Sequence, residues 1–300
     1  MPVIEVDQLR KSYGTVEAVR GVSFAVDEGE VVAVLGPNGA GKTSTVEVLE
    51  GYRTRDDGQV RVLGFDPATG GAELRQRIGI VLQSCGIDPY LTVSEVLRMH
   101  AGYYHAPRPV VDVIGLVGLE EKTDSRVKTL SGGQQRRLDL ALGLIGDPEL
   151  LFLDEPTTGF DPSARRQAWD VVRNLAGLGK TILLTTHYMD EAQALADRVI
   201  MIAAGRIVAE GTPASIGGRS QAKVYIRFTL PPGTTASDLP VAVAVNGDEI
   251  SIETAEPASV LYRLTGWAVE RSLDLGGLTV TRPSLEDVYL ELTAPTDDAR

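Results

Sequence analysis

The sequence predicts an α/β protein with a largely parallel central sheet, followed by a small second domain of the α+β type. From Ile4 to about Pro213, short β-rich runs alternate with helical ones, which is typical of a parallel sheet covered by helices. The composition changes in EGTPASIGGRS, residues 210–220, which is typical of a linker. Strand and helix patterns then resume in a shorter stretch.

Three short apolar runs predict the buried strands of the central sheet. Because they are apolar on both faces, they fit strands covered by helices on each side. They are Glu30–Gly36, Leu150–Glu155 and Thr181–His187. A long stretch with helical periodicity, about Val93 to Gly146, lies between the first two runs.

The second domain shows three strand patterns and two helix patterns. The strands are expected at residues 223–230, 248–254 and 277–281, and the helices at residues 257–273 and 284–293. Ser284, directly after Pro283, is a suitable cap for the last helix.

These patterns divide the chain into four segments. We expect a large α/β domain at 1–213, a linker at 214–222, a small α+β accessory domain at 223–295 and a frayed tail at 296–300.

The overall charge and composition limit the possible partners. The 300 residues carry a formal net charge of −12, which argues against a general nucleic-acid surface, so no nucleic acid is expected as a partner. The single cysteine, Cys85, cannot form an intrachain disulfide, which fits a reducing compartment.

The N-terminus lacks the pattern of a signal peptide, and the apolar runs are far shorter than the ~20 residues that span a bilayer. We therefore expect a cytoplasmic chain, with any membrane crossing supplied by a separate chain.

The octapeptide GPNGAGKT fits the phosphate-binding loop G-x-x-x-x-G-K-[ST], and it lies in the required context between a buried strand and a helix. Lys42 would reach the β- and γ-phosphates of a nucleotide, and the Thr43 hydroxyl would bind Mg²⁺. The nucleotide-binding residues expected here are Gly36, Pro37, Asn38, Gly39, Ala40, Gly41, Lys42, Thr43 and Ser44.

Two carboxylates end the second buried strand, in LLFLDEP. At the carboxyl end of a parallel strand, Asp154 would hold Mg²⁺ through water, and Glu155 would orient or deprotonate an attacking water. His187, at the end of the next strand, could contact the γ-phosphate or that water, although a lone histidine there is more often a structural hydrogen-bonding residue.

Two further residues are weaker candidates. The amide oxygen of Gln83 could complete the Mg²⁺ shell, and Tyr13 could stack on an adenine ring. Taken alone, each also fits an ordinary exposed loop residue. Cys85 has no neighbouring histidine or basic cluster that would mark it as reactive.

The stretch TLSGGQQRRL predicts a helix start, because Ser131 and Gln134 have the spacing of a capping box. The glycines inside the box, Gly132 and Gly133, allow a close approach of another group, and a helix N-terminus attracts anions.

With these motifs in order, the chain resembles a nucleotide-binding subunit of the ATP-binding cassette (ABC) family, a P-loop NTPase with a helical signature subdomain. The resemblance covers about residues 1–213. Its motifs are Tyr13, GPNGAGKT, Gln83, LSGGQ, LLFLDEP, GFDP (residues 159–162) and His187.

The resemblance implies that Ser131, Gly133 and Gln134 of one subunit face the γ-phosphate held by another. Two ATP molecules with Mg²⁺ would then be sandwiched in a head-to-tail homodimer, with Asp161 at the subunit contact. Phe160 departs from the leucine usual in that contact loop.

The C-terminal PSLEDVYLELT resembles ATPase subunits of bacterial exporters of drugs, antibiotics or polysaccharides. This implies an ATP-hydrolysing motor, at the cytoplasmic face of the membrane, that drives a separate permease. The cargo would be a drug, antibiotic or other hydrophobic or complex compound. The alternatives are a soluble ABC-type ATPase clamp acting on the ribosome or DNA, and a scaffold that binds ATP without hydrolysing it.

Overall fold

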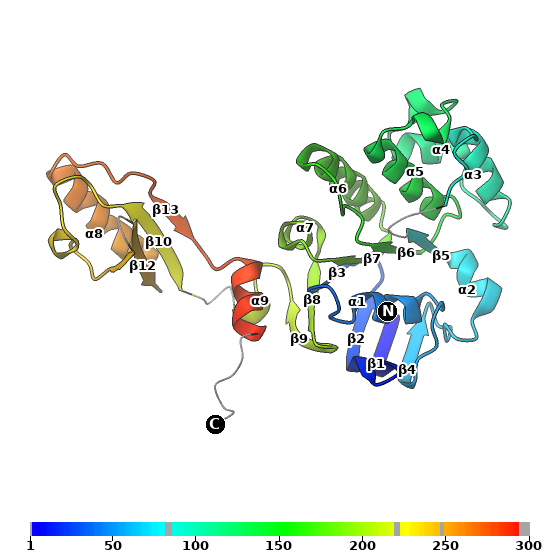
Figure 1. The fold of residues 1–300 in the computed structure, drawn as a ribbon, viewed down its shortest axis with the longest axis horizontal. Coiled ribbons are helices and arrows are strands. Elements are labelled where there is room, and N and C mark those ends of the chain that lie inside the picture. Colours follow the sequence, from blue (N-terminus) through cyan, green and yellow to red (C-terminus); the bar gives the residue numbers. More distant parts are fainter. Residues whose placement is uncertain (1, 82–85, 219–222, 247–248, 294–300) are drawn as a thin grey trace. The chain divides into compact units, whose positions relative to one another are not determined.

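The computed structural model describes residues 2–81, 86–218, 223–246 and 249–293. The chain forms two compact units, Met1–Pro213 and Ala214–Arg300 (Figure 1), and each is described by itself.

The first unit is built on a six-stranded sheet with the order β5-β6-β7-β3-β8-β9. Five of the strands run parallel, and β9 is antiparallel to β8. The predicted α/β class is therefore confirmed. The strands are β3 (Val31–Leu35), β5 (Ile78–Val81), β6 (Leu150–Asp154), β7 (Thr181–Thr186), β8 (Arg198–Ala203) and β9 (Arg206–Gly211).

The three predicted buried strands correspond to β3, β6 and β7, each shorter than expected by one or two residues. In register, Leu35 pairs with Thr186, and Asp154 pairs with Thr185. The carboxyl ends of these strands therefore meet at one edge of the sheet, where the loops after them can form a common site.

A separate three-stranded antiparallel sheet, in the order β2-β1-β4, was not distinguished from the sequence. Ile4, Val6 and Leu9 of β1 are buried, but the alternation is broken because Gln8 has a φ of 51° and the register shifts between Val6 and Leu9. The strands are β1 (Pro2–Tyr13), β2 (Val16–Asp27) and β4 (Asp57–Val62).

Helix α1 lies in the core between the two sheets. Its residues Val46 and Leu49 belong to one cluster with Ile4 of β1 and Phe152 of β6, so α1 is held from both sides. The helices of this unit are α1 (Lys42–Leu49), α2 (Gly71–Arg77), α3 (Val93–Ala101), α4 (Val110–Leu116), α5 (Gly132–Leu144), α6 (Pro162–Gly177) and α7 (Met189–Leu195), with short turns η1 (Glu120–Lys122) and η2 (Val127–Thr129).

The stretch with predicted helical periodicity, about Val93 to Gly146, contains α3, α4 and α5, which pack on one another as a helical group (Figure 1). Helix α5 also packs on β5. The helix with the LSGGQ motif is therefore attached directly to the central sheet.

The second unit has an antiparallel sheet in the order β11-β12-β10-β13. Its core includes Ile226, Phe228, Ile250, Leu264 and Trp267. The elements are η3 (Ile216–Gly218), β10 (Val224–Thr229), η4 (Ala236–Asp238), β11 (Ala244–Asn246), β12 (Glu249–Thr254), α8 (Pro257–Glu270), β13 (Thr279–Thr281) and α9 (Leu285–Thr293).

The cap predicted for the last helix is present, because the Asp287 backbone N–H donates to Ser284 Oγ at 3.0 Å. The tail predicted at residues 296–300 lies outside the described residues.

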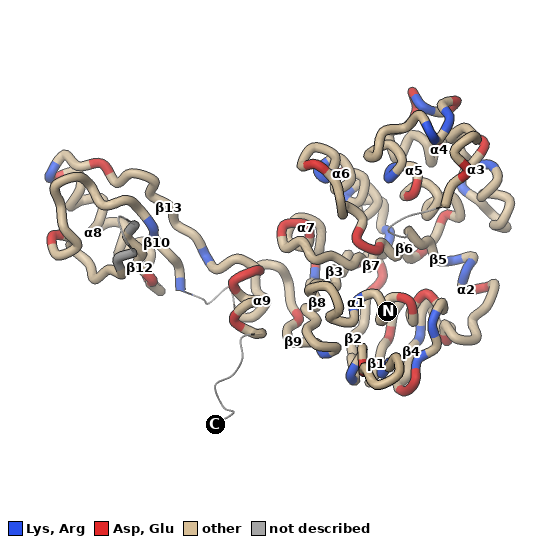
Figure 2. Tube along the Cα trace, in the orientation of Figure 1, with Lys and Arg blue, Asp and Glu red and all other residues tan. Residues whose placement is uncertain are grey.

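Figure 2 shows basic and acidic residues interspersed along the three-stranded sheet and the segments beside it. Several of them pair: Lys11 with Asp56 at 2.7 Å, and Arg55 with Asp66 at 2.7 Å. Within the described part of the chain, we find no helix with the length and hydrophobicity needed to cross a membrane.

The packing of α5 on β5 depends on a glycine, which gives a test of the fold. A Cβ on Gly79 of β5 would lie 2.1 Å from the carbonyl oxygen of Gly143 in α5, so the helix would have to shift. We expect Gly79→Ala to lower the free energy of unfolding by about 1–3 kcal/mol, measured by urea unfolding.

Gly177→Ala is the matched control, because Gly177 lies in helix α6 of the same unit and a Cβ added there would meet nothing within 4 Å. Alanine there should raise stability by about 0.5–1 kcal/mol. A neutral Gly79→Ala variant would contradict the close approach of α5 to the sheet.

Candidate functional site

The predicted phosphate-binding loop lies between β3 and α1, and its backbone requires glycine at two positions. Gly41 has a φ of 104°, and a Cβ there would lie 2.4 Å from the carbonyl oxygen of Ala18. A Cβ on Gly36 would lie 2.3 Å from the carbonyl oxygen of Ile202. Residues 37–39 between them are exposed. The loop therefore presents open backbone of the kind that binds phosphate.

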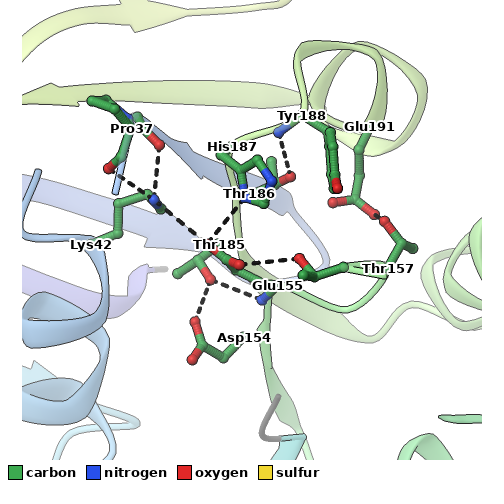
Figure 3. Close-up of polar contacts among 12 residues, drawn as sticks. Pro37, Lys42, Asp154, Glu155, Thr157, Thr185, Thr186, His187, Tyr188 and Glu191 are labelled. Carbon is green, nitrogen blue, oxygen red and sulfur yellow. Dashed lines mark hydrogen bonds and ion pairs between the residues drawn. The ribbon is translucent and has the colours of Figure 1, made fainter. Parts of the chain in front are cut away.

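Lys42, the first residue of α1, has a side chain only 4% exposed. Its Nζ donates to the carbonyl oxygens of Gly36 at 2.8 Å and Pro37 at 3.1 Å, and it lies 3.7 Å from Glu155 Oε1 (Figure 3). Burial lowers the pKa of Lys42, although the charges of Glu155 and Asp154 act in the opposite direction. The ammonium group thus lies against the loop that would hold the phosphates.

The end of β6 turns sharply at Glu155. Asp154 is the last strand residue, and its Oδ1 accepts a hydrogen bond from Thr185 Oγ1 at 2.5 Å. The Glu155 N–H donates to the same Thr185 Oγ1 at 3.0 Å. Glu155 has a φ of 44°, a left-handed conformation that costs a non-glycine residue about 1–3 kcal/mol. A strained backbone at the end of a strand is typical of functional sites.

Three side chains lie within 4 Å of the Glu155 carboxylate oxygens. Thr158 Oγ1 donates to Oε2 at 3.1 Å, while Lys42 Nζ and His187 Nδ1 approach Oε1, the latter at 3.2 Å (Figure 3). Burial alone would raise the pKa of Glu155, but the polar contacts from His187 and Thr158 and the positive charges nearby outweigh it, so the pKa is lowered. Glu155 is therefore a carboxylate at neutral pH.

A hollow of about 350 Å³ is lined by Thr43, Asp154 and Glu50, among others. Glu50 is 6% exposed, and its Oε1 has no hydrogen-bond partner in the described part of the chain. Burial, together with the charges of Asp154 and Glu47, raises the pKa of Glu50 to about 8.

The donors around this hollow fit Mg²⁺. A hydroxyl from Thr43 and a carboxylate from Asp154 are hard oxygen ligands, and Mg²⁺ is usually held by one or two carboxylates together with phosphate and water. Among the described residues, no group of three or more His, Cys, Asp or Glu side chains is placed to hold a metal by itself. The set therefore suits an ion that arrives with a nucleotide.

Tyr13, at the end of β1, lies near the rim of this hollow and is 40% exposed. The Arg53 guanidinium lies 5.7 Å from its ring centroid, and Arg53 pairs with Glu47 at 3.0 Å. Both Arg53 and Glu47 line the hollow beside Thr43. An accessible ring in this position can stack on a base.

The LSGGQ segment starts helix α5, as the capping box predicts. The Gln134 N–H donates to Ser131 Oγ at 3.3 Å, and the Ser131 N–H donates to Gln134 Oε1 at 2.9 Å. Gly133 faces Ala164 of α6, where a Cβ would make an ordinary contact of 3.6 Å. The two side chains of the box therefore hold the helix start in shape.

Ser131, Gly133 and Gln134 line a hollow of about 440 Å³ together with Phe160 and Asp161. Asp161 caps α6 by accepting from the backbone of the first turn, at 2.8 and 3.0 Å. This hollow and the one beside Thr43 share no lining residue.

The structure adds a residue that the sequence analysis did not single out. Arg136 of α5 is 6% exposed, and its Nε donates to the carbonyl oxygen of Pro156 at 2.9 Å. Its Nη2 donates to the carbonyl oxygen of Asp154 at 3.2 Å. The signal in the sequence is the i,i+3 spacing of Arg136 and Asp139, which lie together on the buried face of α5 and pair at 3.6 Å.

Thr158 and Thr185, which bind the two strand-end carboxylates, were also not predicted. A threonine in a strand or loop has no distinguishing pattern, because its role depends on what the fold places opposite it. Gln83, predicted as a metal ligand, and Cys85 lie outside the described residues. Ser44 follows Thr43 in the first turn of α1 and is half-buried.

Known proteins are similar to this chain over both units. A family model described as "ABC transporter" matches residues 19–158, and one described as "ABC transporter domain-containing protein-like, C-terminal domain" matches residues 224–284. The chain is 39% identical to Nod factor export ATP-binding protein I of Burkholderia lata over 305 residues, covering 98% of each chain. Its identity to the protein of that name from Rhizobium meliloti is 38% over 299 residues, covering 97% of this chain and 88% of the relative.

Solved structures are similar over the first unit. An ATP-binding cassette of an ABC transporter in its ADP conformation matches with a TM-score of 0.64 and 25% identity, over 71% of this chain and 91% of that one. The cbiO1 protein of Clostridium perfringens, part of an ABC transporter complex, matches with a TM-score of 0.64 and 28% identity, over 71% and 89%.

The lowered pKa of Glu155 predicts a pH-dependent stability. Because folding lowers this pKa below 4.5, the ionised carboxylate stabilises the fold above pH 4.5, and the contribution is lost as pH falls through the lowered value. Thr158→Val removes one donor to the carboxylate and should lower the free energy of unfolding by about 1.5–3 kcal/mol at neutral pH. Urea unfolding should show this loss shrinking as pH falls below 4.5.

Thr129→Val is the control, since Thr129 Oγ1 donates to an uncharged acceptor, the carbonyl oxygen of Arg126, at 2.7 Å. Its effect should not change over the same pH range. An equally flat profile for Thr158→Val would mean that the hydroxyl does not stabilise the charged form of Glu155.

Proposed function

Because the chain belongs to the ABC transporter family, whose ATP-binding domains hydrolyse ATP, we propose that it is the ATP-hydrolysing subunit of an exporter with a separate membrane-spanning permease. The observation that supports hydrolysis most directly is the meeting of Lys42, Glu155 and His187 at one edge of the sheet (Figure 3). All three are charged or titratable side chains of the types that ATP hydrolysis requires.

In the proposed mechanism, Lys42 exchanges its carbonyl partners for the β- and γ-phosphate oxygens of ATP. The Glu155 carboxylate accepts a hydrogen bond from the attacking water and takes up its proton, while His187 contacts the γ-phosphate. Tyr13 stacks on the adenine. Thr43 and Asp154 would hold Mg²⁺, which neutralises charge on the phosphates; Gln83 is proposed as a further ligand.

We propose that the ATP site is completed by a second copy of this chain. The hollow lined by Ser131 and the hollow lined by Thr43 share no lining residue, so neither hollow of one chain presents both the phosphate loop and the LSGGQ segment. In a head-to-tail dimer, the N-terminus of α5 would bring its N–H groups to the γ-phosphate of the partner's ATP. Asp161, which lines the Ser131 hollow, would lie at the contact.

The permease would dock beside the segment that contains Gln83. A hollow of about 310 Å³ there is lined mainly by apolar and aromatic side chains, including Tyr52, Ile80, Ile87 and Leu142, together with Arg75 and His100. Such a surface suits the end of an apolar helix from a partner. The subunit would then work at the cytoplasmic face of the membrane.

The relatives support export as the direction of transport, because their names state export of Nod factor. We infer that this subunit also serves export, of a drug, antibiotic or other hydrophobic or complex compound. The permease contacts the cargo and therefore selects it.

Mixed variants test the site formed by two subunits. Glu155→Gln and Ser131→Ala should each lower ATP turnover about a hundredfold, because each removes one contact to the reacting groups. Mixed in equal amounts, they should recover roughly a quarter of the wild-type rate, because about half of the dimers would pair one of each and keep one intact site. The measurement is phosphate release by the purified full chains.

No recovery on mixing would place Ser131 and Glu155 in the same site of one chain. Full turnover by either single variant would instead remove that residue from the proposed mechanism.

Affinity purification of the tagged chain from gently solubilised cells tests the transporter assignment. We expect a polytopic membrane protein to co-purify. Ile87→Glu, which places a charge in the proposed docking hollow, should lose it, because burying an unpaired charge at an interface is costly.

Val111→Glu is the matched control, since Val111 of α4 is 73% exposed and does not line that hollow. It should retain the membrane partner. Co-purification of ribosomes or DNA-bound proteins instead would support the soluble ATPase clamp and overturn the exporter assignment.

A further inference from the structure

Glu191 is a fully buried carboxyl group near the proposed site, with 0% exposure, that no step of the mechanism uses. It lies on α7, the helix that begins two residues after His187. Figure 3 shows it beside Thr157, on the side of the site away from Lys42. Buried carboxylates are rare unless hydrogen bonds hold them, so its contacts indicate what it does.

One oxygen of Glu191 binds two separate elements. Thr157 Oγ1 donates to Glu191 Oε1 at 2.7 Å, and Trp169 Nε1 donates to the same atom at 3.1 Å. Thr157 is itself 1% exposed. Trp169 is half-buried, so the hydrogen bond from Thr157 is the one shielded from water, where hydrogen bonds are stronger than at the surface.

These two partners belong to the parts of the chain that carry the proposed chemistry. Thr157 stands two residues after Glu155 and directly before Thr158, which binds the Glu155 carboxylate. Trp169 lies on α6, whose N-cap is Asp161. Glu191 thus joins the helix after His187, the loop after Glu155 and the helix after Asp161.

A purely structural role would not favour a carboxyl group here. The second oxygen, Oε2, is buried without a hydrogen-bond partner in the described part of the chain, which costs free energy that an apolar side chain would avoid. Another link between these elements is at the surface: Arg165 pairs with exposed Asp190 at 3.2 Å and lies over the Tyr188 ring. Surface pairs of this kind contribute little.

We propose that Glu191 is a positioning residue that fixes His187 and Glu155 relative to each other. It would also transmit movement of the loop that contains Asp161, residues 159–162, to both side chains. The inference rests on the proposed function, since it assigns Glu191 a role in that same hydrolysis. If Asp161 lies at the subunit contact, closure of the dimer would reach His187 through Trp169 and Glu191.

Thr157→Val is the first test, because it removes one donor to Glu191 while keeping the shape of the side chain. In the full chain we expect kcat for ATP hydrolysis to fall about tenfold to a hundredfold, because displacement of reacting groups by about an ångström is that costly. The KM for ATP should change less than about threefold, because no proposed nucleotide contact is removed.

Glu191→Leu should show the same loss of kcat, and Glu191→Gln should restore most of it. The glutamine amide oxygen can accept both hydrogen bonds that Oε1 accepts now. Rescue by glutamine and failure of leucine would show that the acceptor, rather than the volume of the side chain, sets the rate.

Val172→Ala is the control for stability alone, since Val172 is buried on α6, the helix that carries Trp169. We expect it to lower the urea midpoint as much as Thr157→Val does and to leave kcat within about twofold. If kcat falls equally in both variants for the same loss of stability, Glu191 is structural and the inference is wrong.

Different results would contradict the proposed ATP hydrolysis and the role of Glu191. Absence of ATP hydrolysis by the wild-type chain would overturn the proposed function and the inference with it. A wild-type chain that hydrolyses ATP, with a Thr157→Val variant of unchanged kcat, would overturn the role of Glu191 alone.

Discussion

The buried ammonium group of Lys42 imposes the constraint on which the rest of the site depends. A charge removed from water needs polar partners, and here they are the loop carbonyls of Gly36 and Pro37 and the carboxylate of Glu155. These partners come from distant parts of the sequence. They meet because β3 and β6 lie in one parallel sheet, with their carboxyl ends at the same edge.

Side chains from β7 and α5 hold the same edge of the sheet in place. Thr185 joins the backbone of Glu155 to the carboxylate of Asp154, while Arg136 of α5 donates to the carbonyl oxygens of the strand end. The helix that starts with the LSGGQ motif is therefore tied to the backbone that carries Asp154 and Glu155 in its own chain. Within one chain, hydrogen bonds therefore link the two segments that we propose to serve different ATP sites.

The second unit is a distinct α+β body with its own core, and residues 224–284 match a C-terminal domain of the same family. Helix α9 returns to pack on the segment Ile216–Gly218, at the start of the unit. A Cβ on Gly217, which has a φ of 62°, would lie 2.3 Å from Val288 of this helix. The positive φ and the close approach of Val288 both favour glycine at this position.

The sequence alone determined the α/β class, the phosphate-binding loop, the strand-end pair Asp154 and Glu155, and the capping box at Ser131, because each is a local pattern with its own physical cause. The antiparallel sheet was not foreseen, since the irregularity at Gln8 breaks its alternation. Tertiary structure alone decided the contacts of Arg136, Thr185 and Glu191. Their partners lie some 18 to 34 residues away, and the value of a buried polar group depends on which atoms the fold places against it.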